Sequence, residues 1–287
     1  MKMKKNVIIV RGGGDIATGT IYKLHQSGYP VLVLETPNPS AIRRFAAFSE
    51  AVYEQTYTVE GVTCKLARDL KQAYEFMEQG MVAMLIDAAG ETIKEVKPAA
   101  LVDAILAKKN LGTNRGMAPF TIALGPGFTA GNDVDAVIET MRGHKLGRII
   151  YEGSAIPNTG IPGVIAGVSK ERVIHAPAKG ILYGEKKIAD YVEKEEVIAY
   201  IYPECKNIEN EKERAEKKAE AIAVKAAISG ILRGLIRDGY PVTKGFKIAD
   251  IDPREGEREN CFTISDKARC IAGGVLEALL HAGILPQ

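Results

Sequence analysis

A glycine-rich segment directly after a short apolar run constrains the fold of this chain most. Val7–Val10 is a continuous apolar run, which is typical of a strand buried on both faces of a sheet. The residues that follow, Gly12, Gly13, Gly14, Asp15, Ile16 and Ala17, fit the G-x-G-x-x-G/A fingerprint and open a helical pattern over Ile16–Ser27. Glycines here let the backbone approach a pyrophosphate, whose charge is met by amide groups at the helix N-terminus. We therefore predict that Gly12–Ala17 binds a phosphate-bearing small molecule.

Glu35 lies where a dinucleotide-binding fold places the acid that binds a ribose hydroxyl. It follows the apolar run Val31–Leu34 and stands 21 residues beyond Gly14. Asp15 is unusual in such a loop, because it puts a negative charge beside the phosphate. It either caps the helix, binds a metal or indicates a ligand other than NAD. The alternative for the whole loop is a tight turn with nothing bound.

Strands and helices alternate through the first half of the chain. Apolar runs predict strands over Met81–Ile86, Phe120–Leu124 and Arg148–Tyr151, and helical patterns cover Leu66–Glu78 and Ala99–Lys109. Such alternation is typical of a parallel sheet with right-handed crossovers. Residues 1–167 are therefore predicted to form a Rossmann-like α/β ligand-binding domain.

A second glycine loop follows Phe120–Leu124 and is predicted to open another helix. Its candidate ligand-binding residues are Gly125, Gly127, Gly131 and Asn132. Two such loops at the carboxyl ends of parallel strands share the crevice in which open sheets bind ligands. Asp133 and Asp135 are interpreted as first-turn acids that stabilise this helix, so no metal site is predicted.

His144 is the candidate proton-transfer residue, because the pKa of a histidine suits acid–base work near neutral pH. The alternative is a surface histidine in the basic turn Arg142–Arg148. The sequence shows no Ser-His-Asp order, HExxH motif or P-loop lysine. Whether the chain is an enzyme is left open.

The second half contains an internal repeat at a constant offset of 50 residues. His175–Ile201 aligns without gaps on Lys225–Ile251, and ten of the 27 positions are identical. In the first copy the identical residues are Ala176, Gly180, Ile181, Leu182, Gly184, Val192, Lys194, Ile198, Ala199 and Ile201. Two copies of one supersecondary unit imply a pseudo-symmetric module in which each half covers the apolar face of the other.

Each copy resembles the half-motif of biotinyl/lipoyl-type domains, with a turn glycine, a later Val and a closing Ile-Ala-x-Ile strand. We predict a small β barrel-sandwich-hybrid module over residues 168–256, with a charged insertion over 203–220. Carrier domains modify a lysine between the halves, where this chain has Lys206 without the usual apolar neighbours. Lys206 is therefore interpreted as an unmodified residue of a solvated loop.

Residues 257–287 are predicted to contain a C-terminal helix that packs on one of the two domains. Ser265 is its expected N-cap, and Asp266 suits its first turn. The stripe that includes Ile271, Val275 and Leu279 supplies the apolar face of this helix.

Composition and charge exclude several classes of partner. The 287 residues carry a net charge of +2 and no basic stripe interleaved with aromatics, so nucleic acid is not an expected partner. The apolar run Val7–Val10 is too short for a signal peptide or a membrane span, which predicts a cytoplasmic protein without membrane contact. The four cysteines show no zinc spacing and are expected to be reduced structural or surface thiols.

Four separated blocks, in the same order, resemble the YqeB-type accessory proteins of the selenium-dependent molybdenum hydroxylase system. They are Arg11–Gly19, Leu124–Asp135, Ile138–His144 and Ala249–Arg254, and the resemblance extends to Ala278. The family is associated with the maturation of molybdenum hydroxylases, and its Rossmann-like part is similar to the XdhC-type factors that handle molybdenum cofactor. The long charged run between the repeat halves departs from the short form of the family.

The resemblance implies an accessory or maturation factor for a selenium-dependent molybdenum hydroxylase. Its implied cofactor at Gly12–Ala17 is a nucleotide, NAD(P) or molybdopterin dinucleotide, and its implied protein partner is a molybdenum hydroxylase or another maturation factor. One alternative is an NAD(P)-dependent oxidoreductase, which the glycine fingerprint favours. The other is a non-enzymatic scaffold whose repeat module binds a hydroxylase.

Overall fold

The computed structural model describes residues 6–160, 163–164, 166–203 and 211–286, and the chain divides into two compact units. Unit 1 consists of Met1–Pro39, Phe45–Thr159 and Thr263–Gln287. Unit 2 consists of Ser40–Arg44 and Gly160–Phe262. The short segment Ser40–Arg44 therefore groups with the second half of the chain, and the C-terminal residues return to the first.

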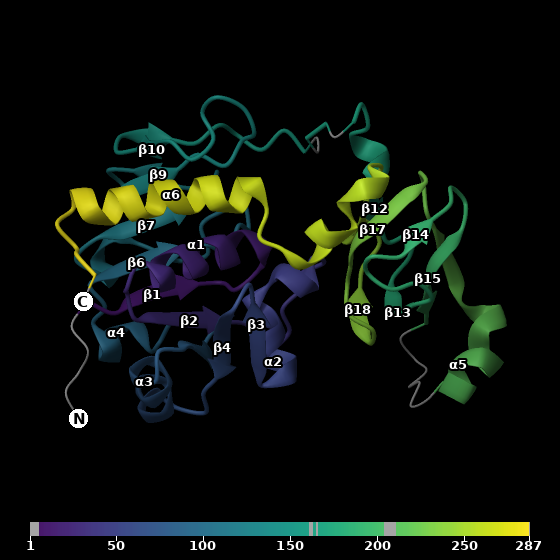
Figure 1. The fold of residues 1–287 in the computed structure, drawn as a ribbon, viewed down its shortest axis with the longest axis horizontal. Helices are drawn as coiled ribbons and strands as arrows, with labels where there is room; N and C mark the ends of the chain where they lie inside the picture. The colour runs from purple at the N-terminus through teal and green to yellow at the C-terminus, as the bar shows by residue number, and fades with distance from the viewer. Residues whose placement is uncertain (1–5, 161–162, 165, 204–210, 287) are drawn as a thin grey trace. The chain divides into compact units, whose positions relative to one another are not determined.

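Unit 1 contains a nine-stranded sheet in the order β10-β9-β7-β6-β1-β2-β5-β4-β3 (Figure 1). Its strands are β1 (Ile8–Arg11), β2 (Val31–Glu35), β3 (Thr56–Val59), β4 (Val62–Leu66), β5 (Val82–Ile86), β6 (Ala100–Asp103), β7 (Thr121–Leu124), β9 (Ala136–Ile138) and β10 (Ile149–Ile150). A separate antiparallel pair joins β8 (Thr129–Ala130) to β11 (Gly153–Ser154). The helices are α1 (Asp15–Gln26), α2 (Ala51–Glu54), α3 (Leu70–Glu78), α4 (Ile93–Val96) and α6 (Asp266–His281). Short 3-10 turns are η1 (Arg44–Ala46), η2 (Phe48–Glu50) and η3 (Arg115–Met117).

The predicted fold class, a Rossmann-like parallel sheet followed by a barrel-sandwich-hybrid module, is wrong. The sheet of unit 1 is mixed, because β3 runs antiparallel to β4 and β10 runs antiparallel to β9, while the pairs between them are parallel. The β3–β4 hairpin turns at Glu60 and Gly61, whose φ angles of 47° and 81° match a tight two-residue hairpin. The partly polar pattern of Thr56–Leu66 lacks the continuous apolar run on which the strand predictions depend.

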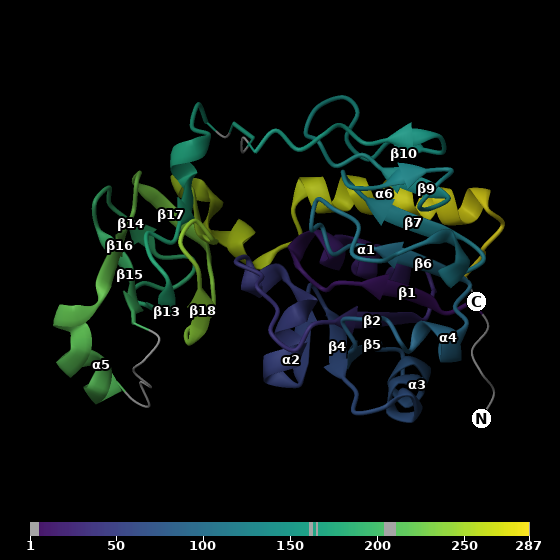
Figure 2. The same ribbon diagram turned by 180° about the vertical axis from the view of Figure 1, so that it is seen from behind.

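Helices pack on both faces of the central strands (Figures 1 and 2), and alternate residues of these strands belong to two different core clusters. The cluster with α1 and α6 contains Ile8, Val10, Ile21, Leu24, Val31, Val33, Ile271 and Val275. The cluster with α3 and α4 contains Val7, Ile9, Leu32, Leu34, Tyr74, Met77 and Ile93. Successive side chains of a strand point to opposite faces, so a continuous apolar run is what a sheet covered on both sides needs.

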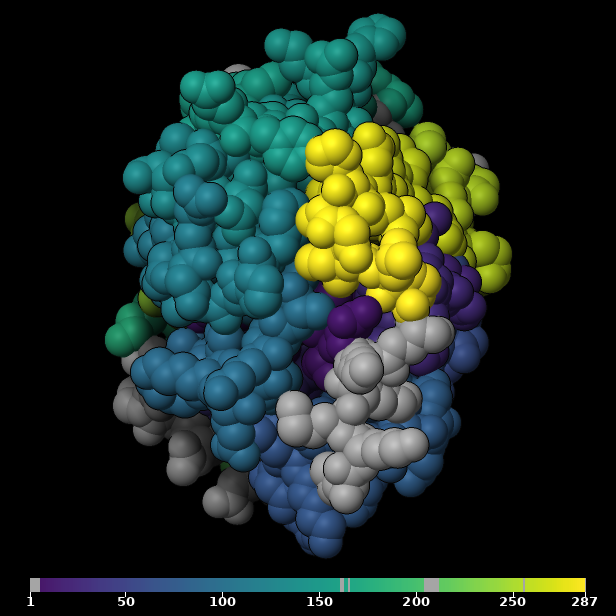
Figure 3. All heavy atoms as spheres, turned by 90° about the vertical axis from the view of Figure 1, so that its left-hand side faces the viewer, coloured from purple at the N-terminus to yellow at the C-terminus, as the bar shows by residue number. Residues whose placement is uncertain are grey.

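Helix α6 packs along α1 within unit 1 through small residues. A Cβ atom on Gly19 of α1 would lie 2.7 Å from the Cβ of Ala268, so the two helices touch closely there. The prediction that Ser265 caps α6 is confirmed, because its side chain accepts a hydrogen bond from Ala268 N–H at 3.2 Å. In the space-filling view, α6 is the yellow patch beside the teal segments of unit 1 (Figure 3). No helix in the described part of the chain combines the length and the apolar character that a membrane crossing needs.

Two helical predictions in unit 1 are wrong. Within the predicted helix Ala99–Lys109 the chain forms β6, which pairs in parallel with β1 and β7. After the second glycine loop it forms β9, which pairs in parallel with β7. Every residue of β6 and β9 is buried, so non-local pairing and burial override the local helical pattern.

Unit 2 consists of two four-stranded antiparallel sheets, β12-β19-β17-β14 and β16-β15-β13-β18. Its strands are β12 (Val173–His175), β13 (Gly180–Gly184), β14 (Tyr191–Val192), β15 (Val197–Tyr202), β16 (Ile222–Lys225), β17 (Gly230–Leu235), β18 (Tyr240–Val242) and β19 (Lys247–Asp252). The 3-10 turns η4 (Lys170–Arg172) and η6 (Glu255–Phe262) flank the strands. Ser40–Arg44 joins this unit beside β17, where Leu235 N–H donates to the Ile42 carbonyl at 2.9 Å.

The internal repeat is visible in the two strand orders. An offset of 50 residues carries β12, β13, β14 and β15 onto β16, β17, β18 and β19. Under this exchange the order of one sheet becomes the order of the other. Each sheet takes strands from both copies, since β14 pairs with β17 and β13 pairs with β18. Neither copy therefore forms a complete sheet by itself.

The predicted charged insertion, 203–220, is described in part. Residues 204–210, which include Lys206, lie outside the described residues. Glu211–Lys217 form α5, and Lys218–Glu220 form the 3-10 turn η5. Among the described side chains of residues 212–220, none is buried.

Candidate functional site

The candidate site lies at the carboxyl ends of β1 and β6, where the strand order of the large sheet changes direction. The chain continues from β1 to β2 on one side, while β6 and β7 lie on the other side. Open α/β sheets bind their ligands at such a switch point. The loops after the two strands touch, because a Cβ atom on Gly12 would lie 3.0 Å from the Ala104 carbonyl oxygen.

A buried polar network joins the loops below this site. Arg11 Nη1 donates to Thr113 Oγ1 at 2.6 Å, and Thr113 Oγ1 donates to Asp103 Oδ2 at 2.6 Å. Arg11 Nη2 donates to the Ala88 carbonyl at 2.9 Å. Burial raises the pKa of Asp103, and hydrogen bonds from Thr113 and the Ile105 N–H oppose this rise, as does the charge of Arg11. The network fixes the ends of β1 and β6 relative to the loops that follow them.

Glu35 at the end of β2 is engaged within the glycine loop. Its Oε2 accepts from Gly13 N–H at 2.6 Å, and its Oε1 accepts from Thr36 N–H at 2.7 Å. Burial raises the pKa of Glu35, although these two N–H donors oppose the rise. The carboxylate therefore orders the loop from inside. Its predicted contact with a ribose hydroxyl stays a prediction.

The three glycines of the loop differ in whether the structure requires a glycine at their position. Gly12 has a φ angle of 95° and is crowded by Ala104, so a side chain there is strained. A Cβ atom on Gly13 would lie 3.0 Å from Met84 Cε and 3.1 Å from Ser49 N. Gly14 differs, because its angles of φ −64° and ψ 177° suit any residue and nothing lies within 4 Å of its Cβ position. Neither packing nor backbone conformation requires a glycine at position 14.

Gly14 is the N-cap of α1, and it supplies no side-chain hydrogen bond to the first turn. The backbone ladder of the helix begins with Thr18 N–H, which donates to the Gly14 carbonyl at 2.8 Å. The N–H groups of the first turn point out of the helix, where they attract negative charge. Asp15 is half-buried in this turn, whereas Ala17 is fully buried and faces the core.

Ser49 lies against the same loop from η2. Its N–H donates to the Gly13 carbonyl at 2.8 Å. Its side-chain oxygen is buried and has no hydrogen-bond partner among the described residues. A buried hydroxyl without a partner is uncommon in folded proteins, and it leaves a donor beside the loop.

The second glycine loop approaches the same part of the sheet without a following helix. A Cβ atom on Gly125 would lie 2.6 Å from Thr140 Oγ1, and one on Gly127 would lie 2.6 Å from Lys109 N. Gly127 therefore contacts the loop after β6, as Gly12 does. Gly131 has a φ angle of 86° in a turn, and Asn132 is exposed. The predicted roles of these residues in ligand binding stay predictions.

Asp133 and Asp135 have roles that differ from the predicted first-turn acids. Asp133 Oδ2 accepts from Thr129 N–H at 2.8 Å. Asp135 Oδ2 accepts from both the N–H and the Oγ1 of Thr121 at 2.8 Å, and its Oδ1 lies 2.7 Å from Arg115 Nε. Both carboxylates therefore fix the loops around β7 and β9. His144 is exposed between β9 and β10, and its role in proton transfer stays a prediction.

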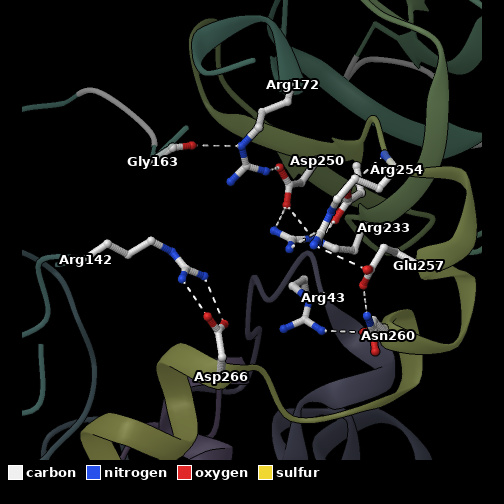
Figure 4. Close-up of polar contacts among 11 residues, drawn as sticks. Arg43, Arg142, Gly163, Arg172, Arg233, Asp250, Arg254, Glu257, Asn260 and Asp266 are labelled. Atoms are coloured by element: carbon white, nitrogen blue, oxygen red, sulfur yellow. Dashed lines mark hydrogen bonds and ion pairs between the residues drawn. The ribbon is translucent and has the colours of Figure 1, made fainter. Parts of the chain in front are cut away.

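A buried charge cluster in unit 2 was missed by the sequence analysis (Figure 4). Asp250 and Asp252 of β19 are each 1% exposed. Asp250 pairs with Arg172 and with Arg233, whose Nε donates at 2.9 Å, and Arg254 donates to both oxygens of Asp252 at 2.9 and 2.8 Å. Burial raises the pKa of Asp252, but hydrogen bonds and charge from Arg254, with the charge of Arg233, outweigh it and lower the pKa. The available signal was the alternation of acids with apolar residues in Ile248–Asp252.

Comparison with known proteins finds a relative by sequence similarity. No protein-family model matches the chain. Over 281 residues it is 48% identical to the protein YqeB of Escherichia coli, and the match covers 97% of this chain and 48% of YqeB. The chain is therefore similar in sequence to about half of YqeB. It spans about half the length of that relative, and the match shows no link to a selenium-dependent molybdenum hydroxylase.

Solved structures give weaker matches to this chain. An aspartoacylase family protein from Mesorhizobium loti is 13% identical, with 88% of this chain and 86% of that chain covered and a TM-score of 0.29. A succinylglutamate desuccinylase from a Silicibacter species is 11% identical, with 86% and 84% covered and a TM-score of 0.26. TM-scores this low assign neither a fold nor an activity to this chain.

The predicted function is wrong and is set aside. The solved structures reported above are named as aspartoacylase and desuccinylase proteins, not as molybdenum-hydroxylase maturation factors or NAD(P)-dependent oxidoreductases, and at their TM-scores they carry no activity over to this chain. The predictions of molybdenum, selenium and Rossmann nucleotide-binding features are wrong as well. The alternative prediction of a scaffold that binds a hydroxylase is also set aside. What remains is the geometry of the glycine loop itself.

Proposed function

We propose that unit 1 binds a small phosphate-bearing anion in front of α1, beside the β1–β6 switch point. The observation that carries this proposal is Gly14, a glycine that the fold does not require. Glycine costs conformational entropy on folding, and it is favoured where a ligand must approach the backbone closely. The open space at Gly14 lies in front of the uncapped first turn of a 12-residue helix.

Two further features support binding at this place. The amide groups of the first turn attract an anion through hydrogen bonds and through the helix dipole. The buried hydroxyl of Ser49, which has no partner among the described residues, lies on a residue whose N–H already contacts Gly13. The proposal concerns binding of a phosphate group, and it assigns no reaction.

Gly14→Val is expected to weaken the binding of inorganic phosphate at least tenfold. The branched side chain fills the open space, and ten-fold corresponds to about 1.4 kcal/mol. The variant is expected to fold, since the φ angle of −64° suits valine and no atom lies within 4 Å of the Cβ position. Phosphate titrations followed by the amide resonances of residues 14–17 measure the change.

The matched control is Gly273→Ala in α6. Like Gly14, Gly273 has no atom within 4 Å of its Cβ position and no positive φ angle, but it lies in α6 rather than in the glycine loop. This variant should bind phosphate as the wild type does. Equal phosphate affinities of Gly14→Val and the wild type would contradict the proposed site.

Asp15→Asn is expected to tighten phosphate binding roughly threefold to tenfold, on the order of 1 kcal/mol. The change removes a negative charge from the first turn, next to the proposed anion. Calorimetry at low ionic strength is the suitable measurement, because salt screens this repulsion. If Asp15 instead holds a cation that bridges to the phosphate, the same variant binds phosphate more weakly, and the proposal of a directly bound anion fails.

A further inference from the structure

One face of the sheet β16-β15-β13-β18 carries a group of tyrosines under residues 211–220. Tyr183 of β13 and Tyr200 of β15 are direct neighbours in the strand register. Tyr202 packs edge-on against Tyr183, with 5.7 Å between ring centroids, and its hydroxyl donates to the Arg214 carbonyl at 3.2 Å. We call Tyr183, Tyr200 and Tyr202 the tyrosine face, and residues 211–220 the cover segment.

Two cations of the cover segment lie over two rings of the tyrosine face. The guanidinium carbon of Arg214 is 5.0 Å from the Tyr183 ring centroid, and Lys218 Nζ is 4.5 Å from that of Tyr200. Each cation also has an acidic neighbour: Lys218 Nζ lies 3.2 Å from Glu185, and Arg214 Nη1 lies 3.8 Å from Asp238. The face therefore presents two adjacent places for a cation, each built from a ring and a carboxylate.

The spacing of the two cations matches this pair of places. Arg214 lies in α5, and Lys218 follows four residues later at the start of η5, and each contacts a ring of the tyrosine face. Tyr183 and Tyr200 stand opposite each other on neighbouring strands. The tyrosine face thus selects for charge and for separation, rather than for apolar side chains.

The cover segment lies at the surface of unit 2. Its side chains between 212 and 220 are exposed or half-buried in the structure, and the side chains of both ion pairs are between 24% and 54% exposed. Its sequence is charged on all sides, with alanine as its apolar residue type. A helix of this length is marginal by itself in water, and exposed ion pairs add little to its stability.

The pseudo-symmetric position in the other sheet provides an internal comparison. Arg233, Asp250 and Asp252 take the places of Tyr183, Tyr200 and Tyr202 at the offset of 50 residues. There the preceding segment contributes Arg172, whose ion pair with Asp250 is buried, with side chains 9% and 2% exposed. One face is therefore closed by buried ion pairs, whereas the tyrosine face is covered by ion pairs that solvent reaches.

We propose that the tyrosine face is a docking site for a basic segment of a partner protein, one that presents two cationic side chains four residues apart. Residues 211–220 occupy this site within the same chain and are displaced when the partner binds. Charge complementarity indicates a basic partner, since the ring faces, Glu185 and Asp238 all attract cations. This site lies in unit 2 and is independent of the phosphate site proposed in unit 1.

The test uses the full chain and a fluorescent peptide with the sequence of residues 211–222 as the probe. In the double variant Arg214→Ser, Lys218→Ser the cover segment loses both cations, so the tyrosine face becomes available. We expect this variant to bind the peptide at least tenfold more tightly than the wild type, by fluorescence anisotropy at low ionic strength. A peptide with glutamate at the positions of Arg214 and Lys218 should not bind. Lys212→Ser, which removes an exposed cation from the same helix, is the matched control and should behave as the wild type.

Two further changes locate the peptide. Adding Tyr183→Leu and Tyr200→Leu to the double variant should abolish binding, and circular dichroism shows whether the sheets are retained. Adding Glu185→Gln instead should weaken binding severalfold, because it removes one acid from the surface without disturbing the core. Equal peptide affinities of the wild type and the double variant would overturn the proposal, as would binding that survives both further changes. Self-association of the wild type that the double variant lacks would assign the face to a second copy and also overturn it.

Discussion

Asp250→Ala is expected to lower the free energy of unfolding of unit 2 by about 3–5 kcal/mol. Asp250 is 1% exposed, and it accepts hydrogen bonds from Arg172 and from Arg233. The change removes the counter-charge that Arg172 and Arg233 share, although Arg233 Nη1 still lies 3.8 Å from Asp252, and breaking a buried pair from one side costs more than the pair contributes. Hydrogen exchange of peptides from β17 and β19, followed by mass spectrometry, should show the loss of protection.

The control is an ion pair of the same chemistry in an exposed position. Arg142 and Asp266 of unit 1 form two hydrogen bonds at 2.8 and 3.1 Å, but their side chains are 41% and 74% exposed (Figure 4). Arg142→Ala should cost about 1 kcal/mol or less, because solvent screens such pairs. If Asp250→Ala costs no more than Arg142→Ala, the buried cluster does not hold unit 2 together.

The elements that sequence analysis predicted in unit 1 are those whose signal is local. Continuous apolar runs predict β1, β2, β5 and β7, and a glycine after a strand predicts the start of α1. The sequence analysis predicted helices where β6 and β9 form. Ala100–Asp103 and Ala136–Ile138 are strands because they pair with β7, which their local sequence does not show. A pairing partner distant in sequence leaves no periodicity in the strand itself.

In the candidate site, too, the local features could be predicted from the sequence and the contacts between distant residues could not. Glycine spacing indicates the loop at Gly12–Gly14, but it does not distinguish two glycines required by packing from one that is not. The hydrogen bonds of Glu35 to Gly13 and Thr36 depend on the meeting of β1 and β2, and the sequence shows only a suitable distance along the chain. The charge cluster of unit 2 was missed because Arg172, Arg233 and Asp250 come together through strand exchange between the two repeats.

Gly180→Ala and Gly230→Ala are expected to destabilise unit 2 by similar amounts, roughly 2–4 kcal/mol from overpacking and from an unfavourable backbone angle. The two glycines stand at equivalent positions of the repeat, with φ angles of 158° and 152°. A Cβ atom would lie 2.2 Å from the Tyr202 carbonyl oxygen in the first case and 2.3 Å from that of Asp252 in the second. Since these atoms belong to the backbone of the neighbouring strands, neither clash is relieved by rotating a side chain.

The interleaving of the repeats decides how far each change propagates. Because β13 pairs with β18 and β14 pairs with β17, disturbing one copy removes hydrogen-bond partners from the other. Hydrogen exchange should therefore report loss of protection in β13, β15, β17 and β19 together for either variant. Gly256→Ala, at a position with open space and no positive φ angle, is the control and should leave protection unchanged. If Gly180→Ala exposes the first copy while β17 and β19 stay protected, the two copies fold separately, and the shared sheets do not make unit 2 cooperative.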